Sequence, residues 1–338
     1  MIKYLKNQIL DLLIRINNGK WHNDSGVKIL IQTNHSFRSE NWDKLFSEDI
    51  FFSNGRAEIK FTNDRITFYK LFDEANFCFC FSLRKTAKLP NSKPKLLYFP
   101  VTGNDFLSGK MIPNNYIIET PAGISSQAIA EYVLAMVMSM NRNLQVVSKN
   151  QVFKNWDQQA IINYPFISIK EKKIGILGLG RNGTAIANLF GSVGCKVIAC
   201  DSSFMDHPKI SETYSIDRLD IFLSQCDVLI LSLPLNETTA NLIDEFKIQL
   251  LKSNTIVVNV GRGGVIDDTS LINAAKQGKI RGAILDVFRQ EPLPRSHPFW
   301  KLKNIIVTPH IAGNINIFKY EIMQDFITKI KSVSHRQL

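Results

Sequence analysis

The chain of 338 residues has only five cysteines, at positions 78, 80, 195, 200 and 226. Their positions match neither the spacing of zinc ligands nor the density of cysteines in a small disulfide-rich secreted domain. Most of them fall in apolar runs that resemble buried strands. The cysteines therefore predict reduced thiols in a protein core, no metal site and a cytoplasmic protein.

Long apolar runs are also missing, since none reaches the roughly 18–20 residues that a membrane-spanning helix requires. The first twenty residues are interrupted by Asp11 and Arg15 and lack the apolar core of a signal peptide. Their apolar positions are spaced as on one face of a helix. A helix packed on the domain or on a partner is favoured over a membrane-surface anchor.

The chain is basic, with 41 Lys and Arg against 30 Asp and Glu, a formal net charge of +11. Such an excess can indicate binding to nucleic acid or to an anionic membrane. Here residues 1–120 hold 17 basic and 12 acidic residues, and residues 121–338 hold 24 and 18. This even spread indicates a solvated basic surface, so we expect no nucleic acid and no membrane as partners. Association with nucleic acid stays open as a weaker alternative.

The most informative pattern is the glycine-rich segment Gly178-Leu179-Gly180-Arg181-Asn182-Gly183, between an apolar strand at 174–177 and a helical stretch at 184–193. Gly178 permits a tight turn, Gly180 lets the backbone approach a pyrophosphate, and Gly183 lets the helix pack on the strand. Free N–H groups at the helix N-terminus would bind the phosphates. The segment predicts a dinucleotide site, with a purely structural glycine turn as the alternative.

A second strand, 196–200, ends at Asp201, 18 residues beyond Gly183. A carboxylate at this position can accept both ribose hydroxyls of an adenosine and would repel a 2′-phosphate. The sequence therefore favours NAD over NADP as the cofactor.

Strands and helices alternate after residue 172, as expected for two mononucleotide-binding halves of a doubly wound parallel sheet. Helices are predicted at 216–225 and 268–276. The six predicted strands are 174–177, 196–200, 227–232, 255–260, 282–286 and 305–308.

The first 120 residues contain predicted strands at 27–32, 78–83 and 95–99, which favour a second α/β domain with a parallel sheet. Val101-Thr102-Gly103 follows the last of these strands, at the sheet edge where such domains bind ligands. A broad apolar helix is predicted from about 125 to 141, and the polar stretch 143–169 is interpreted as a connection.

Three ends of predicted strands carry side chains suited to hydride transfer with a 2-keto acid. Arg262 can bind a carboxylate through its planar fork. Histidine is the side chain suited to proton transfer near neutrality, so His310 can give a proton to the carbonyl oxygen, while Glu291 would orient the histidine and favour its protonated form. Each has a structural alternative: Arg262 as a partner in a surface ion pair, Glu291 as an acid in a loop, and His310 as a buried core histidine. Val260, Gly261 and Asp286 lie in the same segments, where the nicotinamide would bind.

From about residue 95 to 318 the sequence resembles the D-isomer-specific 2-hydroxyacid dehydrogenases. The resemblance implies Arg262, Glu291 and His310 as catalytic residues, Asp201 at the adenosine ribose and Asp286 at the nicotinamide carboxamide. Pro234 and Thr238 would lie in the loop that passes the adenosine, and the carboxylate would also meet N–H groups near Thr102 and Gly103. The matching motifs are GLGRNG (178–183), LPLNETTANLI (233–243), NVGRGGVID (259–267), GAILDVFRQEPLP (282–294) and IIVTPHIAG (305–313).

The resemblance also implies a substrate domain at 1–120, completed by a C-terminal helix within 315–338, and an NAD-binding Rossmann domain at 121–314. The helix after Pro121 would serve a homodimer interface. Val101 and Phe106 depart from the residues usual in the family, which leaves the 2-keto acid open, and Glu291 argues against the formate-oxidising branch. A scaffold that senses NAD(H) without turnover remains the alternative to an enzyme.

Overall fold

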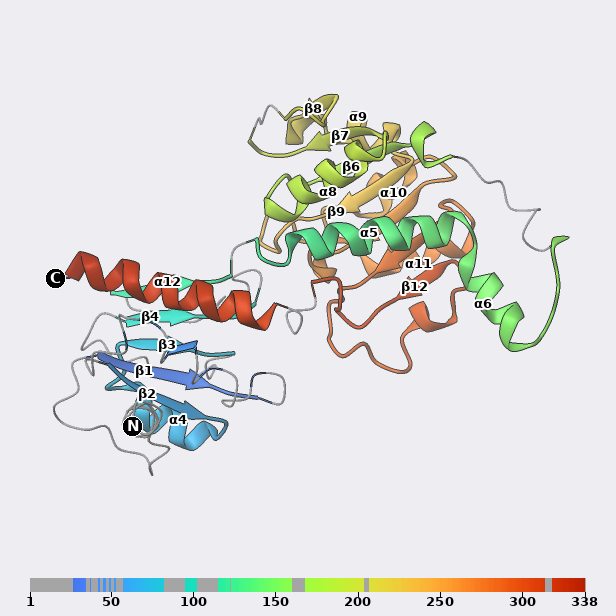
Figure 1. The fold of residues 1–338 in the computed structure, drawn as a ribbon. Helices are drawn as coiled ribbons and strands as arrows, with labels where there is room; N and C mark the ends of the chain where they lie inside the picture. The colour runs from blue at the N-terminus through green and yellow to red at the C-terminus, as the bar shows by residue number, and fades with distance from the viewer. Residues whose placement is uncertain are drawn as a thin grey trace. The chain divides into compact units, whose positions relative to one another are not determined.

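The computed structural model describes residues 27–34, 37, 42, 45–46, 49, 52, 57–81, 95–101, 115–121, 123–159, 168–203, 207–313 and 318–337. The predicted helix within residues 1–20, and Thr102, Gly103 and Phe106, lie outside these ranges. The chain divides into two compact units, residues 1–124 with 315–338 and residues 125–314 (Figure 1). No disulfide joins any of the five cysteines, all of which are buried.

The first unit contains a five-stranded sheet in the order β2-β1-β3-β4-β5, in which every pairing is parallel. This order is that of a doubly wound α/β domain, as predicted. The strands are β1 (Val27–Gln32), β2 (Ala57–Thr62), β3 (Phe77–Phe79), β4 (Lys95–Tyr98) and β5 (Tyr116–Glu119).

The predicted strand at 78–83 was too long. The backbone N–H of Cys80 still donates to the carbonyl of Tyr98 at 2.9 Å, but that of Phe81 donates to the side chain of Gln32 at 2.9 Å. A side-chain acceptor thus takes the N–H of Phe81, and β3 ends before this residue. The sequence interpretation also did not include β2, β5 or the helix α4 (Arg65–Phe72).

Each face of this sheet is covered by a helix, as the ribbon shows (Figure 1). Helix α12 (Lys319–Gln337) buries Met323 and Phe326 against Phe79 and Tyr98. On the other face, Phe68 and Phe72 of α4 pack in one cluster with residues of β1, β3 and β4. The segment after residue 315 therefore supplies part of the core of the first unit.

The second unit contains a seven-stranded sheet in the order β12-β11-β10-β9-β6-β7-β8, again parallel at every pairing. The order reverses at β6, as in the Rossmann fold, which confirms the predicted fold class. The short edge strand β8 was not predicted. The strands are β6 (Lys173–Leu177), β7 (Lys196–Cys200), β8 (Glu212–Tyr214), β9 (Val228–Leu231), β10 (Ile256–Asn259), β11 (Gly282–Leu285) and β12 (Ile305–Val307).

Helices bury both faces of this sheet, so its central strands consist almost entirely of apolar residues. One face packs on α5 (Ser126–Asn141) and α8 (Arg181–Ser192). The other packs on three short helices, α9 (Leu219–Gln225), α10 (Glu245–Leu250) and α11 (Asp268–Lys276). The interpretation of 143–169 as a connection was wrong for α6 (Leu144–Val152), a helix with no buried residue.

Candidate active site

The glycine turn between β6 and α8 has the geometry expected for a phosphate-binding turn. Gly178 has a φ of +99°, which side chains rarely adopt. A Cβ on Gly183 would lie 2.0 Å from the carbonyl oxygen of Gly178, whereas a Cβ on Gly180 would meet no atom within 4 Å. No side chain caps α8, which begins at Arg181. The open space at Gly180 and the uncapped N–H groups fit the pyrophosphate of a dinucleotide.

Asp201 follows β7 and faces this turn. Its Oδ2 accepts a hydrogen bond from the N–H of Leu179 at 2.6 Å, and its Oδ1 accepts one from the N–H of Ser203 at 2.9 Å. Partial burial on its own would raise the pKa of Asp201, but these hydrogen bonds hold that pKa below its usual value. The group is therefore a carboxylate at neutral pH, in contact with the glycine turn.

Other predicted cofactor residues lie in two loops that touch each other. A Cβ on Gly261 would lie 2.6 Å from the carbonyl oxygen of Leu233, so the loops after β9 and β10 are in backbone contact. Pro234 accepts a hydrogen bond from Thr239, and Thr238 is exposed and donates to Asn236. Val260 is buried. Asn182 accepts a hydrogen bond from Ser126 at 2.7 Å, which ties the start of α8 to α5.

The three predicted catalytic segments follow β10, β11 and β12, which are neighbours in the sheet. Because the strands are parallel, their carboxyl ends lie at the same edge. The first two loops are in direct contact, since a Cβ on Gly263 would lie 2.1 Å from the carbonyl carbon of Phe288. The structure thus brings the loops of Arg262, Glu291 and His310 together within one unit.

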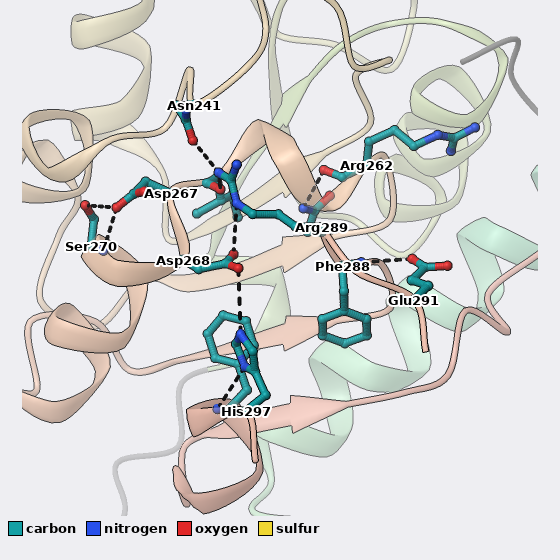
Figure 2. Close-up of polar contacts among 12 residues, drawn as sticks. Asn241, Arg262, Asp267, Asp268, Ser270, Phe288, Arg289, Glu291 and His297 are labelled. Atoms are coloured by element: carbon teal, nitrogen blue, oxygen red, sulfur yellow. Dashed lines mark hydrogen bonds and ion pairs between the residues drawn. The ribbon is translucent and has the colours of Figure 1, made fainter. Parts of the chain in front are cut away.

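Glu291 and His310 form the central pair of this site. Nδ1 of His310 lies 2.8 Å from Oε2 of Glu291, and the two side chains are 51% and 37% exposed. The other carboxylate oxygen, Oε1, accepts a hydrogen bond from the N–H of Phe288 at 2.9 Å (Figure 2). A carboxylate at Nδ1 fixes the hydrogen on that nitrogen and directs Nε2 to another partner. The pair can therefore present Nε2 to a substrate.

Asp286 holds the loop that carries His310. This carboxylate is 1% exposed and accepts hydrogen bonds from the hydroxyl of Thr308 and from the N–H groups of Ile311 and Ala312, at 2.6–2.9 Å. His310 itself has a φ of +54°, in the left-handed region. One of these three donors precedes His310 in the chain and two follow it, so together they hold the backbone of His310 in this conformation. The predicted contact of Asp286 with the carboxamide stays a prediction.

Arg262 extends from the loop after β10 (Figure 2). Its Nη1 donates to the carbonyl of Gly261 at 2.8 Å. Asn259, buried at the end of β10, donates through Nδ2 to the carbonyl of Arg262 at 3.0 Å and accepts from the N–H of Gly261 at 3.1 Å. Sequence reasoning gave Asn259 no role, although a polar residue that ends an apolar strand was a usable signal.

No three His, Cys, Asp or Glu residues in the described ranges come together in a way that could hold a metal ion. In the same ranges, no helix combines the length and the apolar character that a membrane crossing needs.

Comparison with known proteins places this site in a family. The family model described as "D-isomer specific 2-hydroxyacid dehydrogenase, NAD binding domain" matches residues 134–312. A glyoxylate reductase of Thermofilum pendens is 34% identical over 202 residues, which are 59% of this chain and 59% of the relative. The match thus spans less than two thirds of that relative.

Two solved structures bear on the fold and the cofactor. A D-isomer specific 2-hydroxyacid dehydrogenase family protein from Aeromonas salmonicida is similar over 92% of this chain and 97% of its own, with a TM-score of 0.74 and 24% identity. At that identity the likeness concerns the fold alone. A D-isomer specific 2-hydroxyacid dehydrogenase from Xanthobacter autotrophicus, solved with NADPH and MES, covers 56% of this chain and 76% of its own, with a TM-score of 0.51 and 31% identity.

Proposed function

The chain belongs to the D-isomer specific 2-hydroxyacid dehydrogenase family, and we propose that it interconverts a small 2-keto acid and its D-2-hydroxy acid with NAD. As a member of the family it is an NAD(P)-binding oxidoreductase. The observation that carries the proposal is the pair of His310 and Glu291, 2.8 Å apart. This pair lies at the end of a sheet whose glycine turn fits a dinucleotide.

In the proposed reaction, each of the three residues has one task. Bound NADH supplies a hydride to the carbonyl carbon of the keto acid. His310 gives the proton on Nε2 to the carbonyl oxygen, so that the C=O bond becomes an alcohol, and Glu291 stabilises the charged ring before the transfer. Arg262 binds the substrate carboxylate through its two terminal nitrogens. In the reverse direction His310 accepts the alcohol proton.

For the cofactor we infer NAD rather than NADP. Asp201 stands at the end of β7, and two loop N–H groups keep it ionised. A fixed negative charge there would repel a 2′-phosphate and accept the ribose hydroxyls. The related structure with NADPH makes the choice of cofactor a necessary part of the test.

For the substrate, the names of relatives favour a small keto acid, since one curated relative is called a glyoxylate reductase. Residues 1–120 with 315–338 would form the substrate domain, and residues 121–314 the NAD-binding domain. Val101 is half-buried beside the apolar cluster on the α4 face of the first sheet. Together with Thr102 and Gly103, Val101 would contact the substrate.

We also propose that the protein is a homodimer that uses α6 and the residues after it. Figure 1 shows α6 as the continuation of α5 beyond the second sheet. Val152, Phe153 and Trp156 are 76%, 70% and 95% exposed in the single chain. Apolar side chains gathered on one segment mark an interaction surface. Light scattering of the wild type and of Trp156→Ser tests this point, and a monomeric wild type contradicts it.

The central experiment is NADH oxidation against a panel of 2-keto acids, including glyoxylate and hydroxypyruvate, with NADPH alongside. Turnover with NADH, and loss of about a hundredfold or more of that rate in His310→Ala, is expected if the histidine is the acid catalyst. Asp201→Ala should reduce the preference for NADH over NADPH.

Two other outcomes would contradict parts of the proposed reaction. Tight NADH binding without turnover of any keto acid would favour a scaffold that senses NAD(H). Undiminished turnover in His310→Ala would contradict the proposed acid catalyst while leaving the family assignment intact.

A further inference from the structure

Arg289 lies two residues before Glu291, but its side chain turns to the opposite side of the loop (Figure 2). Its Nη2 donates to the side-chain oxygen of Asn241 and to the carbonyl oxygen of Ile266. Its Nε lies 3.6 Å from a carboxylate oxygen of Asp268. One guanidinium thus connects the loop after β11 to three separate acceptors.

These acceptors belong to a well-fixed part of the second unit. The N–H of Asn241 donates to the carbonyl of Gly264 at 2.9 Å, and Ile243 and Ile266 form a parallel β-bridge. Asp268 is the first residue of α11, and its side chain is only 25% exposed. The anchor of Arg289 therefore consists of a backbone carbonyl, the partly buried carboxylate of Asp268 and the exposed side chain of Asn241, whose backbone is itself hydrogen-bonded.

Asp268 also has a histidine as a second neighbour. Nε2 of His297 lies 3.8 Å from the other carboxylate oxygen of Asp268. Burial raises the pKa of Asp268, and the charges of Arg289 and His297 act against that rise. Arg289 thus helps to keep a half-buried carboxylate ionised, and that carboxylate in turn holds Arg289.

The loop between Asp286 and Glu291 is in this way held on both sides. On one side Glu291 bonds to His310 and to the N–H of Phe288. On the other side the guanidinium of Arg289 holds the loop to the segment before α11, and the backbone of Phe288 lies directly on Gly263. The side chain of Glu291 is 37% exposed, and its Oε1 accepts a hydrogen bond from the N–H of Phe288 in the same loop, so its position depends on the loop.

We propose that Arg289 is a positioning residue that holds the 286–291 loop so that the Glu291 carboxylate meets His310. The inference rests on the proposed function, in which Glu291 orients the catalytic histidine. Arg289 has no contact with the reacting atoms and acts through Glu291. An ion pair of an exposed arginine contributes only about 0–1 kcal/mol to the free energy of unfolding. A measurement of stability alone therefore does not test the positioning role of Arg289.

The kinetic test compares Arg289→Ala with Arg295→Ala, a matched arginine that is exposed on the same connection. Arg289→Ala should lower kcat roughly tenfold, since a misplacement of about 1 Å can cost up to a hundredfold, and should leave KM for NADH unchanged. Arg289→Lys should restore part of the rate, and Arg295→Ala should match the wild type.

A double-mutant cycle separates positioning from a general structural role. In a Glu291→Ala background, Arg289→Ala should cause no further loss of kcat, because the group through which it acts is gone. Equal losses in both backgrounds would overturn the inference. Asp268→Asn, which leaves Arg289 in place but weakens its anchor, should give a smaller loss with the same dependence on Glu291.

Hydrogen exchange supplies a readout that needs no turnover. The N–H of Phe288 donates to Glu291, so its exchange should quicken at least severalfold in Arg289→Ala and stay unchanged in Arg295→Ala. Unchanged exchange in both variants would contradict the positioning role. If the wild type reduces no keto acid, the proposed reaction fails, and this measurement alone still decides whether Arg289 holds the loop.

Discussion

The hydroxyl groups of Tyr132 and Thr308 lie 2.6 Å apart, although 176 residues separate them in the sequence. Thr308 uses its hydrogen to donate to Asp286 at 2.6 Å, so Tyr132 is the donor to Thr308. Burial raises the pKa of Tyr132 to about 12, and the phenol therefore keeps its proton at neutral pH. The chain from Tyr132 through Thr308 to Asp286 connects α5 to the loop of His310.

Tyr132→Phe should test this connection. The variant removes one hydrogen bond to a half-buried hydroxyl and should lower the free energy of unfolding by about 1 kcal/mol. It should also lower kcat severalfold, because the loop of His310 loses one of its supports. Urea unfolding measures the free energy of unfolding, and steady-state kinetics measure kcat. Unfolding and kcat identical to the wild type would show that this contact does not support the loop.

The glycine turn gives a prediction that separates folding from cofactor binding. A Cβ on Gly183 would lie 2.0 Å from a backbone oxygen, while one on Gly180 meets nothing. Gly183→Ala should therefore destabilise the second unit by several kcal/mol, as backbone overpacking does. Gly180→Ala should unfold at the wild-type temperature and bind NADH at least tenfold more weakly, because its methyl group occupies the space proposed for the pyrophosphate.

Calorimetry with and without NADH checks both variants of the turn. If Gly180→Ala binds NADH as tightly as the wild type does, the pyrophosphate does not lie over this residue.

The second unit could be predicted from sequence because its signals are local. Buried parallel strands need continuous apolar runs, and Val228–Leu231 and the three residues 256–258 form such runs. The glycine turn and the strand-end residues Arg262, Glu291 and His310 lie beside these runs. Their adjacency then follows from the rule that parallel strands end at one edge.

Features that depend on distant partners could not be predicted in this way. β2 includes Glu58 and Lys60, which are largely buried and lie 3.3 Å apart as an ion pair, so its sequence does not resemble that of a core strand. Helix α6 has no buried residue, so no core-facing apolar stripe marked it in the sequence. The contacts of Arg289 with Asn241 and Asp268 join segments that only the sheet order brings together.

The first unit offers a prediction on the hydroxyl of Tyr98, which donates to Asp325 of α12 at 2.8 Å. Tyr98 is fully buried in β4, and burial together with Asp325 raises the pKa of its phenol. Tyr98→Phe keeps the ring packing and leaves Asp325 without this donor, so we expect a loss of about 1–3 kcal/mol in unfolding free energy. Asp325→Asn, which can still accept, should lose less. Equal stability of Tyr98→Phe and the wild type would contradict a role in docking α12.

Asp267 caps α11 just before the anchor of Arg289. Its Oδ1 accepts hydrogen bonds from the N–H and the hydroxyl of Ser270, at 2.8 and 2.6 Å. These bonds hold the pKa of Asp267 below its usual value. Since the folded state has the lower pKa, the carboxylate stabilises the fold above its unfolded pKa of about 3.9, and this stabilisation is lost as the pH falls through the folded value.

Asp267→Ala should therefore lower the free energy of unfolding by about 1 kcal/mol at pH 7, the usual cost of a lost helix cap. The difference from the wild type should begin to shrink as the pH falls below about 4, where the carboxyl group of the unfolded chain takes up a proton, and should be lost below the lower pKa of the folded state. Urea unfolding of both proteins at several pH values between neutral and acidic measures this difference. Ser270→Ala removes the hydroxyl donor but keeps the N–H bond, and should show a smaller change with the same pH dependence. A difference between Asp267→Ala and the wild type that stays constant with pH would mean that the charge of Asp267 does not stabilise α11.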